Sequence, residues 1–244
     1  MSSKENIEKY QEQIRIIEWN AIKSYIPKGC KFLDVGCGAG YSLMKAFVDL
    51  NCTVKGVDPE PGAHGVGRYS ENLWKERPII QASAENLPFE EEQFDIIYSS
   101  HVLEHVNSET LSLSEMKRVV KSDGRLIIGM PTASMAWLAF FSHFIFTTHI
   151  NLLFLIKSFK NKDFIQRLSL LFIPKSHSFP NANYIFYDLK HYRINNWKKV
   201  ISKEFEIEKI ILPAFYPFPD FIQFFKMRKN FFLSSSVFFI CSKK

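Results

Sequence analysis

The chain has 244 residues, of which 46% are hydrophobic and 23% charged, which supports one domain with a sizeable insert. Its net charge of +6 is unevenly distributed. Acidic residues outnumber basic ones by four in residues 1–150, whereas residues 151–244 carry 16 basic and 6 acidic residues. The four cysteines are scattered with no C-x-x-C pair, a pattern that buried thiols in a reducing, cytoplasmic compartment explain better than disulfides or a metal site.

The first predicted element is an amphipathic helix within residues 1–28. This stretch is polar and charged, unlike a secretory signal, and its Ile7, Tyr10, Ile14 and Ile17 recur at helical spacing. We expect the helix to pack on the domain that follows it.

Residues 32–40, with the sequence FLDVGCGAG, are the most informative segment. A short apolar run ends in glycines at positions 36, 38 and 40, and a helical stretch over 41–50 follows, which predicts a buried parallel strand, a tight turn and a helix start. Glycine permits the positive φ angles of such a turn, and a helix N-terminus attracts anionic or polar ligand groups. The third glycine comes one residue earlier than in dinucleotide sites, and Asp34 would repel a pyrophosphate but could bind an ammonium group.

A second strand is predicted over residues 53–58, and it ends in Asp58. In nucleotide-binding α/β folds an acid at this place accepts hydrogen bonds from both ribose hydroxyls. Taken alone, a strand-end acid is more often solvated, but its position after the glycine turn favours a ligand role. Pro59 suits the opening of the next loop because it has no N–H to donate.

The glycine turn resembles motif I of the class I S-adenosylmethionine (SAM) dependent methyltransferases, in their small-molecule "type 11" group. Residues 81–89, QASAENLPF, are similar to that family's G-D-A-E-x-L-P-F segment. Ser83 stands where the family's adenine-binding aspartate would be. The resemblance therefore implies that the adenine contact passes to the Ser83 hydroxyl and the backbone around Ala84, with Glu85 beside the ring.

The next predicted strand, residues 94–100, leads into His101 and His105, in a segment close to the family's L-E-H ending. Its carboxyl end should lie beside the first strand, at the switch point where open α/β sheets bind ligands. Both histidines are thus candidate bases near the methyl donor. The alternatives are that His105 is a helix-start residue bonded to loop backbone, and that His101 forms a wall of the pocket.

The resemblance covers about residues 28–131, and it continues through a predicted helix over 109–121, a turn at 122–124 and a strand over 125–130. Two final strands are expected over 206–212 and 236–242, after a helical pattern within 184–203. We therefore predict a single α/β domain: a Rossmann-like, doubly wound, seven-stranded sheet, mostly parallel, with an antiparallel strand seven. Its core would be residues 28–131 and 204–244, with an α-helical insert or cap over about 132–190 after strand five.

The insert is apolar at first and then basic. No charged side chain occurs from Leu126 to Ile156, and residues 157–167 form a basic amphipathic segment. We expect one or two helices lying over the active site, either with an apolar face at a bilayer interface or as a cap packed on the sheet. A transmembrane helix is disfavoured, because both flanking strands must return to one sheet.

The resemblance implies a SAM-dependent methyltransferase that releases S-adenosylhomocysteine. No metal site is expected, because no cluster of His, Cys and Asp has metal-ligand spacing. His105 and His101 are the catalytic candidates. The expected cofactor site comprises Asp34, Gly36, Cys37, Gly38, Gly40, Asp58, Pro59, Ser83, Ala84, Glu85, Ser100 and His101.

The acceptor is expected to be a small molecule, a lipid-linked compound or a glycan, methylated at oxygen. Dense phenylalanine runs disfavour nucleic acid as a partner, and the basic half favours peripheral contact with an anionic membrane. Two alternatives are a non-catalytic SAM-fold scaffold, which Ser83 would allow, and an NAD or nucleotide-sugar enzyme, which Asp34 and the early third glycine disfavour.

Overall fold

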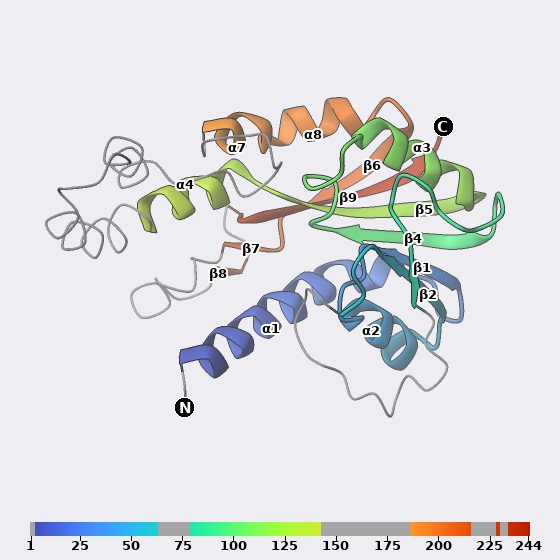
Figure 1. The fold of residues 1–244 in the computed structure, drawn as a ribbon, viewed down its shortest axis with the longest axis horizontal. Coiled ribbons are helices and arrows are strands. Elements are labelled where there is room, and N and C mark those ends of the chain that lie inside the picture. Colours follow the sequence, from blue (N-terminus) through green and yellow to red (C-terminus); the bar gives the residue numbers. More distant parts are fainter. Residues whose placement is uncertain (1–2, 63–78, 143–185, 216–227, 230–233) are drawn as a thin grey trace, which may run out of the picture.

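The structure, a computed structural model, describes residues 3–62, 79–142, 186–215, 228–229 and 234–244. A seven-stranded sheet with the order β3-β2-β1-β4-β5-β9-β6 forms its centre (Figure 1). The strands are β1 (Lys31–Val35), β2 (Thr53–Asp58), β3 (Ile79–Gln81), β4 (Phe94–Ser100), β5 (Val120–Pro131), β6 (Phe205–Ile211) and β9 (Ser236–Lys243). Neighbouring strands from β3 to β5 pair in parallel, and β9 is antiparallel to β5 and β6. The predicted fold class is confirmed.

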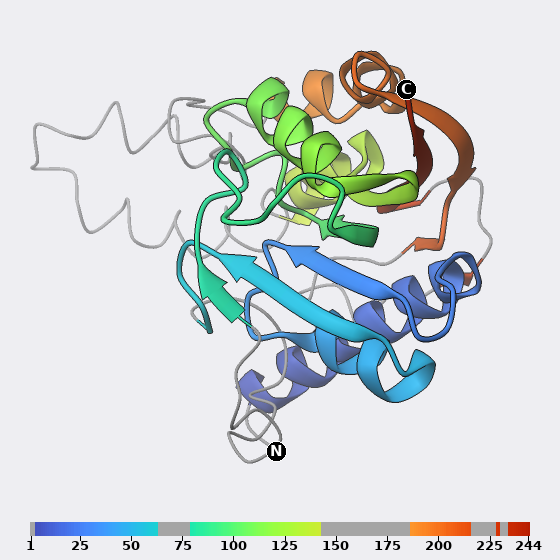
Figure 2. The same cartoon turned by 90° about the vertical axis from the view of Figure 1, so that its right-hand side faces the viewer.

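Helices cover both faces of this sheet (Figures 1 and 2). One face carries α1 (Ser3–Ile22), a short 3₁₀ turn η1 (Lys23–Tyr25) and α2 (Tyr41–Leu50), and the other carries α3 (Glu109–Val119), α7 (Phe186–His191) and α8 (Ile194–Ile201). The helix α4 (Ala133–Ser142) follows β5 directly. A buried hydrophobic cluster fills each side, with Leu33 and Trp197 on the α3 and α8 side and Phe32 and Leu43 on the α1 and α2 side.

Alternation along β1 decides which face each side chain joins. Leu33 and Val35 enter the cluster under α3, whereas Phe32 enters the cluster under α1. Because side chains alternate along a strand, Asp34 shares the α1 side with Phe32. The strand that supplies core residues to both layers therefore also aims a carboxylate toward α1.

The N-terminal helix packs on the domain as predicted, through an aromatic group. Trp19 meets the rings of Phe32 and Tyr98 edge-on, with centroids 6.4 and 6.5 Å apart, and Phe32 and Tyr98 are stacked. The Trp19 indole N–H also donates to Asp49 on α2 at 2.9 Å. These contacts fix the carboxyl-terminal part of α1 against β1, β4 and α2.

The prediction for residues 120–124 was wrong. The helix α3 ends at Val119, and residues 120–124 belong to β5 instead of completing a helix and a turn. The register jumps from Phe94–Val120 to Ile96–Arg125, so the extra residues are accommodated as an irregularity in the pairing. Gly124 permits it, since a Cβ there would lie 2.7 Å from Val120 and 2.9 Å from the Asp95 carbonyl oxygen.

The segment between β5 and β9 is described in part. The helices α4, α7 and α8 bear out its helical character, whereas the rest of the predicted cap, residues 143–185, lies outside the described residues. The connection before β9 contains two short paired strands, β7 (Ala214–Phe215) and β8 (Arg228–Lys229). Among the described helices, none is both long enough and apolar enough to cross a bilayer.

Candidate functional site

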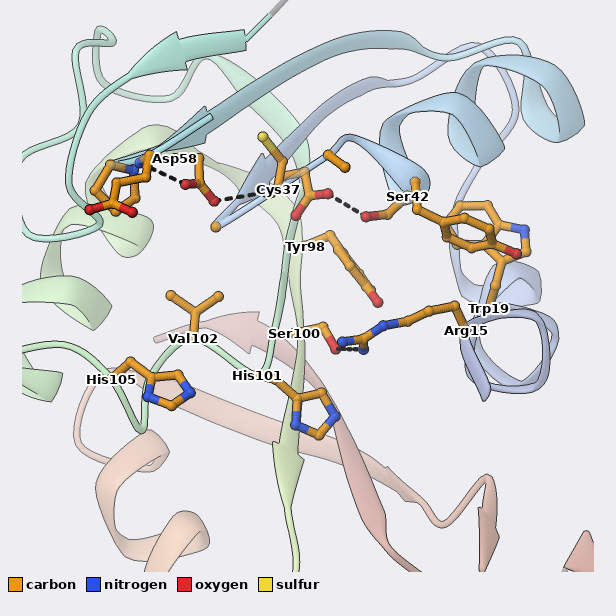
Figure 3. A pocket seen from close by; sticks show the side chains of 17 residues that line it. Arg15, Trp19, Cys37, Ser42, Asp58, Tyr98, Ser100, His101, Val102 and His105 are labelled. Atoms are coloured by element: carbon orange, nitrogen blue, oxygen red, sulfur yellow. Dashed lines mark hydrogen bonds between the residues drawn. The ribbon is translucent and has the colours of Figure 1, made fainter. Parts of the chain in front are cut away.

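A cavity of about 690 Å³ opens at the carboxyl ends of β1, β2 and β4, beside α1 (Figure 3). Its volume is in the range typical of small-molecule and cofactor pockets. The described lining residues are Arg15, Trp19, Asp34, Gly36, Cys37, Gly38, Ala39, Tyr41, Ser42, Asp58, Pro59, Glu60, Tyr98, Ser100, His101, Val102 and His105. The site therefore lies at the predicted switch point, between β1 and β4.

The floor of the cavity is the glycine turn. Gly36, Gly38 and Gly40 have φ angles of +78°, +51° and +84°, in the left-handed region that favours glycine. Gly36 also needs its missing side chain, because a Cβ there would lie 2.2 Å from a methyl carbon of Val102. The loop after β4 therefore closes directly onto the turn after β1.

The carboxylate of Asp58 is fixed by two backbone donors. Its Oδ2 accepts from the Gly38 N–H at 2.7 Å, and its Oδ1 accepts from the Glu60 N–H at 2.8 Å. Asp58 is only 7% exposed, yet it lines the cavity, so its remaining lone pairs face any ligand there. This arrangement suits a pair of vicinal hydroxyl groups, as in a ribose.

Asp34 is the most deeply buried acid of the cavity, at 1% exposure. Its Oδ2 accepts a short hydrogen bond from the Ser42 hydroxyl at the start of α2. Burial raises the pKa of Asp34 to about 7, against the opposing influence of Ser42 and Arg15. A buried carboxylate with so high a pKa is suited to a cationic ligand group, which would favour its ionised form.

The helix α1 contributes a basic side chain that was not predicted. Arg15 pairs with Glu18 at 2.9 Å, and its guanidinium lies 3.4 Å from the Ser100 hydroxyl at the end of β4 (Figure 3). Among the described residues that line the cavity, Arg15 is the only arginine or lysine. It brings positive charge to the side of the cavity that also holds Asp34.

His101 is held between two buried carboxylates. Its Nε2 lies 3.5 Å from Glu18 and its Nδ1 lies 3.4 Å from Glu104. Burial by itself lowers the pKa of His101, but hydrogen bonds with Glu104 and Glu18 more than offset this and raise the pKa to about 9. The ring is therefore a cation near neutral pH, which suits a charged wall of the cavity and does not suit a proton acceptor.

His105 differs from His101 in its surroundings. Its side chain is 45% exposed at the cavity, and its Nε2 lies 4.0 Å from the Glu104 Oε1. Its backbone N–H donates to the Val102 carbonyl at 2.8 Å, as expected of a residue that shapes the loop. The interpretation of His105 as a helix-start residue is wrong, because α3 begins only at Glu109, with Ser108 as its N-cap. The backbone of His105 forms a turn ahead of that helix, while its ring faces the cavity.

Eight of the twelve predicted cofactor residues line the cavity, and Gly40, Ser83, Ala84 and Glu85 are not among the lining residues. Gly40 precedes α2 as its N-cap. The Glu85 carboxylate accepts from the Ser108 N–H at 2.6 Å, ahead of α3, and from Ser83 at 3.2 Å. In this structure the 83–85 segment thus braces the start of α3.

Several lining residues were missed by the sequence reasoning: Arg15, Trp19, Tyr41, Ser42, Glu60, Tyr98 and Val102. One signal was present for α1. Glu18 lies four residues after Ile14, on the predicted apolar face, and a charged residue on such a face indicates a buried ionic partner. Ser42 and Tyr98 carried no comparable signal, because only the folded sheet brings them to Asp34.

Residues 33–128 match the family model of a methyltransferase domain. The chain is 31% identical over 111 residues to the ubiquinone/menaquinone biosynthesis C-methyltransferase of Campylobacter jejuni, which covers 43% of this chain and 46% of that protein. It is 37% identical over 113 residues to an uncharacterized methyltransferase of Mycobacterium tuberculosis, which covers 45% and 42% respectively. The chain thus spans less than half the length of these curated relatives.

Two solved structures share the fold over nearly the whole chain. One is a SAM-dependent methyltransferase of Thermotoga maritima, described as a possible histamine N-methyltransferase, with a TM-score of 0.55 and 17% identity over 98% of this chain and 99% of that one. The other is a protein of Pyrococcus horikoshii, with a TM-score of 0.55 and 17% identity over 96% and 91%. At this level of identity the likeness establishes the fold alone.

Proposed function

We propose that the chain, which belongs to the class I SAM-dependent methyltransferases, is an active enzyme that transfers a methyl group from SAM to a small acceptor. The family's cofactor is SAM, and the observation that carries the proposal is the pair of buried carboxylates, Asp34 and Asp58, in one cavity. Their environments differ in the way that an ammonium group and a ribose require.

The residues present fit the cofactor group by group. Asp34, steadied by Ser42, would hold the methionine ammonium, and Asp58 would hold the two ribose hydroxyls. Arg15 supplies the positive charge that the methionine carboxylate needs. Gly36, Cys37 and Gly38 would pass beneath the amino-acid tail, because the missing side chains of the glycines leave room for close approach.

When bound, SAM supplies a methyl group on an already activated sulfonium, so the protein mainly has to align the acceptor and exclude water. Trp19 and Tyr98 contribute ring surface to the cavity, and Val102 closes the glycine turn. For an oxygen acceptor, we assign the general base to His105. Its exposed ring can take the hydroxyl proton, and Glu104 would stabilise the imidazolium that forms.

The acceptor class is inferred from the composition of the chain after β5. We assign acceptor binding to the segment between β5 and β9, with O-methylation of a lipid-linked, quinone-like or glycan compound as the expected reaction. The uncharged run from Leu126 to Ile156 and the basic residues beyond it support such an acceptor. We place the enzyme in the cytoplasm, in peripheral contact with a membrane, because that is where an apolar acceptor with an anionic group would be met.

Calorimetric titration with SAM tests the cofactor site. We expect Asp34→Ala and Asp58→Ala each to weaken binding by about ten- to a hundredfold, since a hydrogen bond to a charged group contributes about 1.5–3 kcal/mol. Asp123→Ala is the matched control, because Asp123 is an exposed acid away from the cavity. Unchanged SAM binding by both cavity variants would refute this site, and no binding by the wild type would favour a non-catalytic scaffold.

A further inference from the structure

The helix α4 carries large aromatic rings on its outer side. Trp137 and Phe141, four residues apart, are 49% and 50% exposed, and their rings stack with centroids 5.8 Å apart. The inner side of the same helix, with Ala136 and Phe140, packs against the core. No charged residue occurs in α4, and a helix without a polar face is normally covered on all sides.

The neighbouring helix extends this surface. The helices α4 and α7 pack together, and Phe186 at the start of α7 is 55% exposed. Because α4 follows the carboxyl end of β5, it lies on the side of the molecule where the strands end and where the proposed cofactor cavity opens (Figure 1). We call Trp137, Phe141 and Phe186 the aromatic face.

The exposed charges of α7 and of the turn after it are basic, and Glu109, which reaches α7 from α3, is paired with His191 at 2.8 Å. In the described parts of residues 131–201, the acid Asp188 is buried, whereas Lys190, Arg193 and Lys199 are exposed. The sequence joining α4 to α7, residues 143–185, continues this bias with five basic residues and one acidic residue. An aromatic surface edged by positive charge is complementary to an apolar layer covered by anionic groups.

We propose that the aromatic face docks on an anionic lipid bilayer and so brings the cofactor cavity to a membrane-borne acceptor. This inference rests on the proposed methyltransferase function for its purpose and on the exposed rings for its evidence. Tryptophan and phenylalanine lie favourably at the boundary between headgroups and acyl chains, and lysine and arginine bind the anionic headgroups above them. A soluble acidic protein could pair with the basic residues. It would not, however, offer an apolar layer in which the exposed rings of the uncharged helix α4 could be buried.

Vesicle flotation of the full chain tests the proposal, with vesicles of phosphatidylcholine alone and of phosphatidylcholine with phosphatidylglycerol. We expect binding to the anionic vesicles, weaker binding at high salt, and at least about a fivefold lower bound fraction for Trp137→Ala/Phe141→Ala. Phe47→Ala is the matched control, because Phe47 is 53% exposed on α2, on the other side of the sheet. Its bound fraction should equal that of the wild type.

A second measurement reports on the ring itself. Brominated lipids should quench part of the tryptophan fluorescence of the wild type, and Trp137→Phe should lose that part. The proposal is overturned by absence of binding to anionic vesicles, by equal binding of the double variant, or by self-association through these rings in vesicle-free solution. SAM calorimetry on the double variant separates the two proposals, because vesicle binding can be lost or absent while SAM binding persists.

Discussion

At the scale of single residues, the charge of Asp34 should decide how the proposed cofactor site responds to pH. Burial raises the pKa of Asp34 to about 7, so in the free protein the carboxyl is partly protonated at neutral pH. An ammonium ligand binds the ionised form, and binding therefore releases a proton. We predict that SAM affinity is maximal above pH 7 and falls by up to about tenfold for each pH unit below it.

Calorimetry from pH 5.5 to 8.5, in buffers of different ionisation enthalpy, measures both the affinity and the proton release. Asp34→Asn should bind weakly at every pH and show no proton release. The same variant should unfold at a higher temperature than the wild type at pH 8, because the carboxylate that it removes is costly to bury when ionised. A pH-independent affinity of the wild type would show that Asp34 does not hold the ammonium.

At the scale of elements, α1 is held to the cavity by a charged contact as well as by rings. Glu18 is fully buried, and Arg15 and His101 offset the effect of burial and hold the pKa of Glu18 at about 2. The pKa of His101 is raised to about 9, so its charged form stabilises the folded state fully below pH 6.5. That contribution is lost as the pH rises through 9.

We therefore predict that the wild type loses thermal stability between pH 7 and 9.5, and that His101→Gln shows a smaller loss over the same range. Differential scanning calorimetry at closely spaced pH values measures this. Asn107→Gln, in the same loop, is the control and should follow the wild type. Identical pH profiles for His101→Gln and the wild type would mean that the imidazolium does not tie α1 to the loop.

The glycine turn makes a second prediction at this scale. Gly36→Ala should destabilise the fold by about 2–4 kcal/mol, because it combines a positive φ with overpacking against Val102. Gly29→Ala is the control, since Gly29 has a similar φ of +72° but open space around its Cβ position. Adding Val102→Ala should recover part of the loss in urea unfolding. If Gly36→Ala and Gly29→Ala lose the same free energy of unfolding, the contact between Gly36 and Val102 does not contribute to the effect.

Elements whose signals are contiguous in the sequence could be predicted. The strand ending at Val35, the glycine turn and the strand ending at Asp58 were placed correctly because hydrophobic runs and glycines mark them locally. Residues 120–124 were misplaced, since their polar sequence is typical of a turn, whereas the pairing with β4 keeps them extended. Ser42 reaches Asp34, and Arg15 reaches Ser100, only through tertiary packing, which no local pattern encodes.

At the scale of the whole molecule, the proposed function assigns different tasks to the chain up to β5 and to the chain after it. The chain up to β5 supplies β1, β2, β4 and the cavity proposed for the cofactor, and it contains the match to the family model over residues 33–128. The chain after β5 closes the sheet through β6 and β9 and carries the aromatic face, and its residues 151–244 have 16 basic against 6 acidic residues. We therefore expect substitutions in the aromatic face to change acceptor use while leaving SAM affinity unchanged.

Transfer of labelled methyl groups tests the central claim most directly. The protein would be incubated with methyl-labelled SAM and a cell extract that includes its membranes, and mass spectrometry would follow the label. We predict a labelled small or lipid-linked product with the wild type and with Phe47→Ala. The product should be lost with Asp58→Ala and with His105→Gln, although His105→Gln should still bind SAM. A wild-type protein that binds SAM but labels no acceptor and forms no S-adenosylhomocysteine would contradict the account.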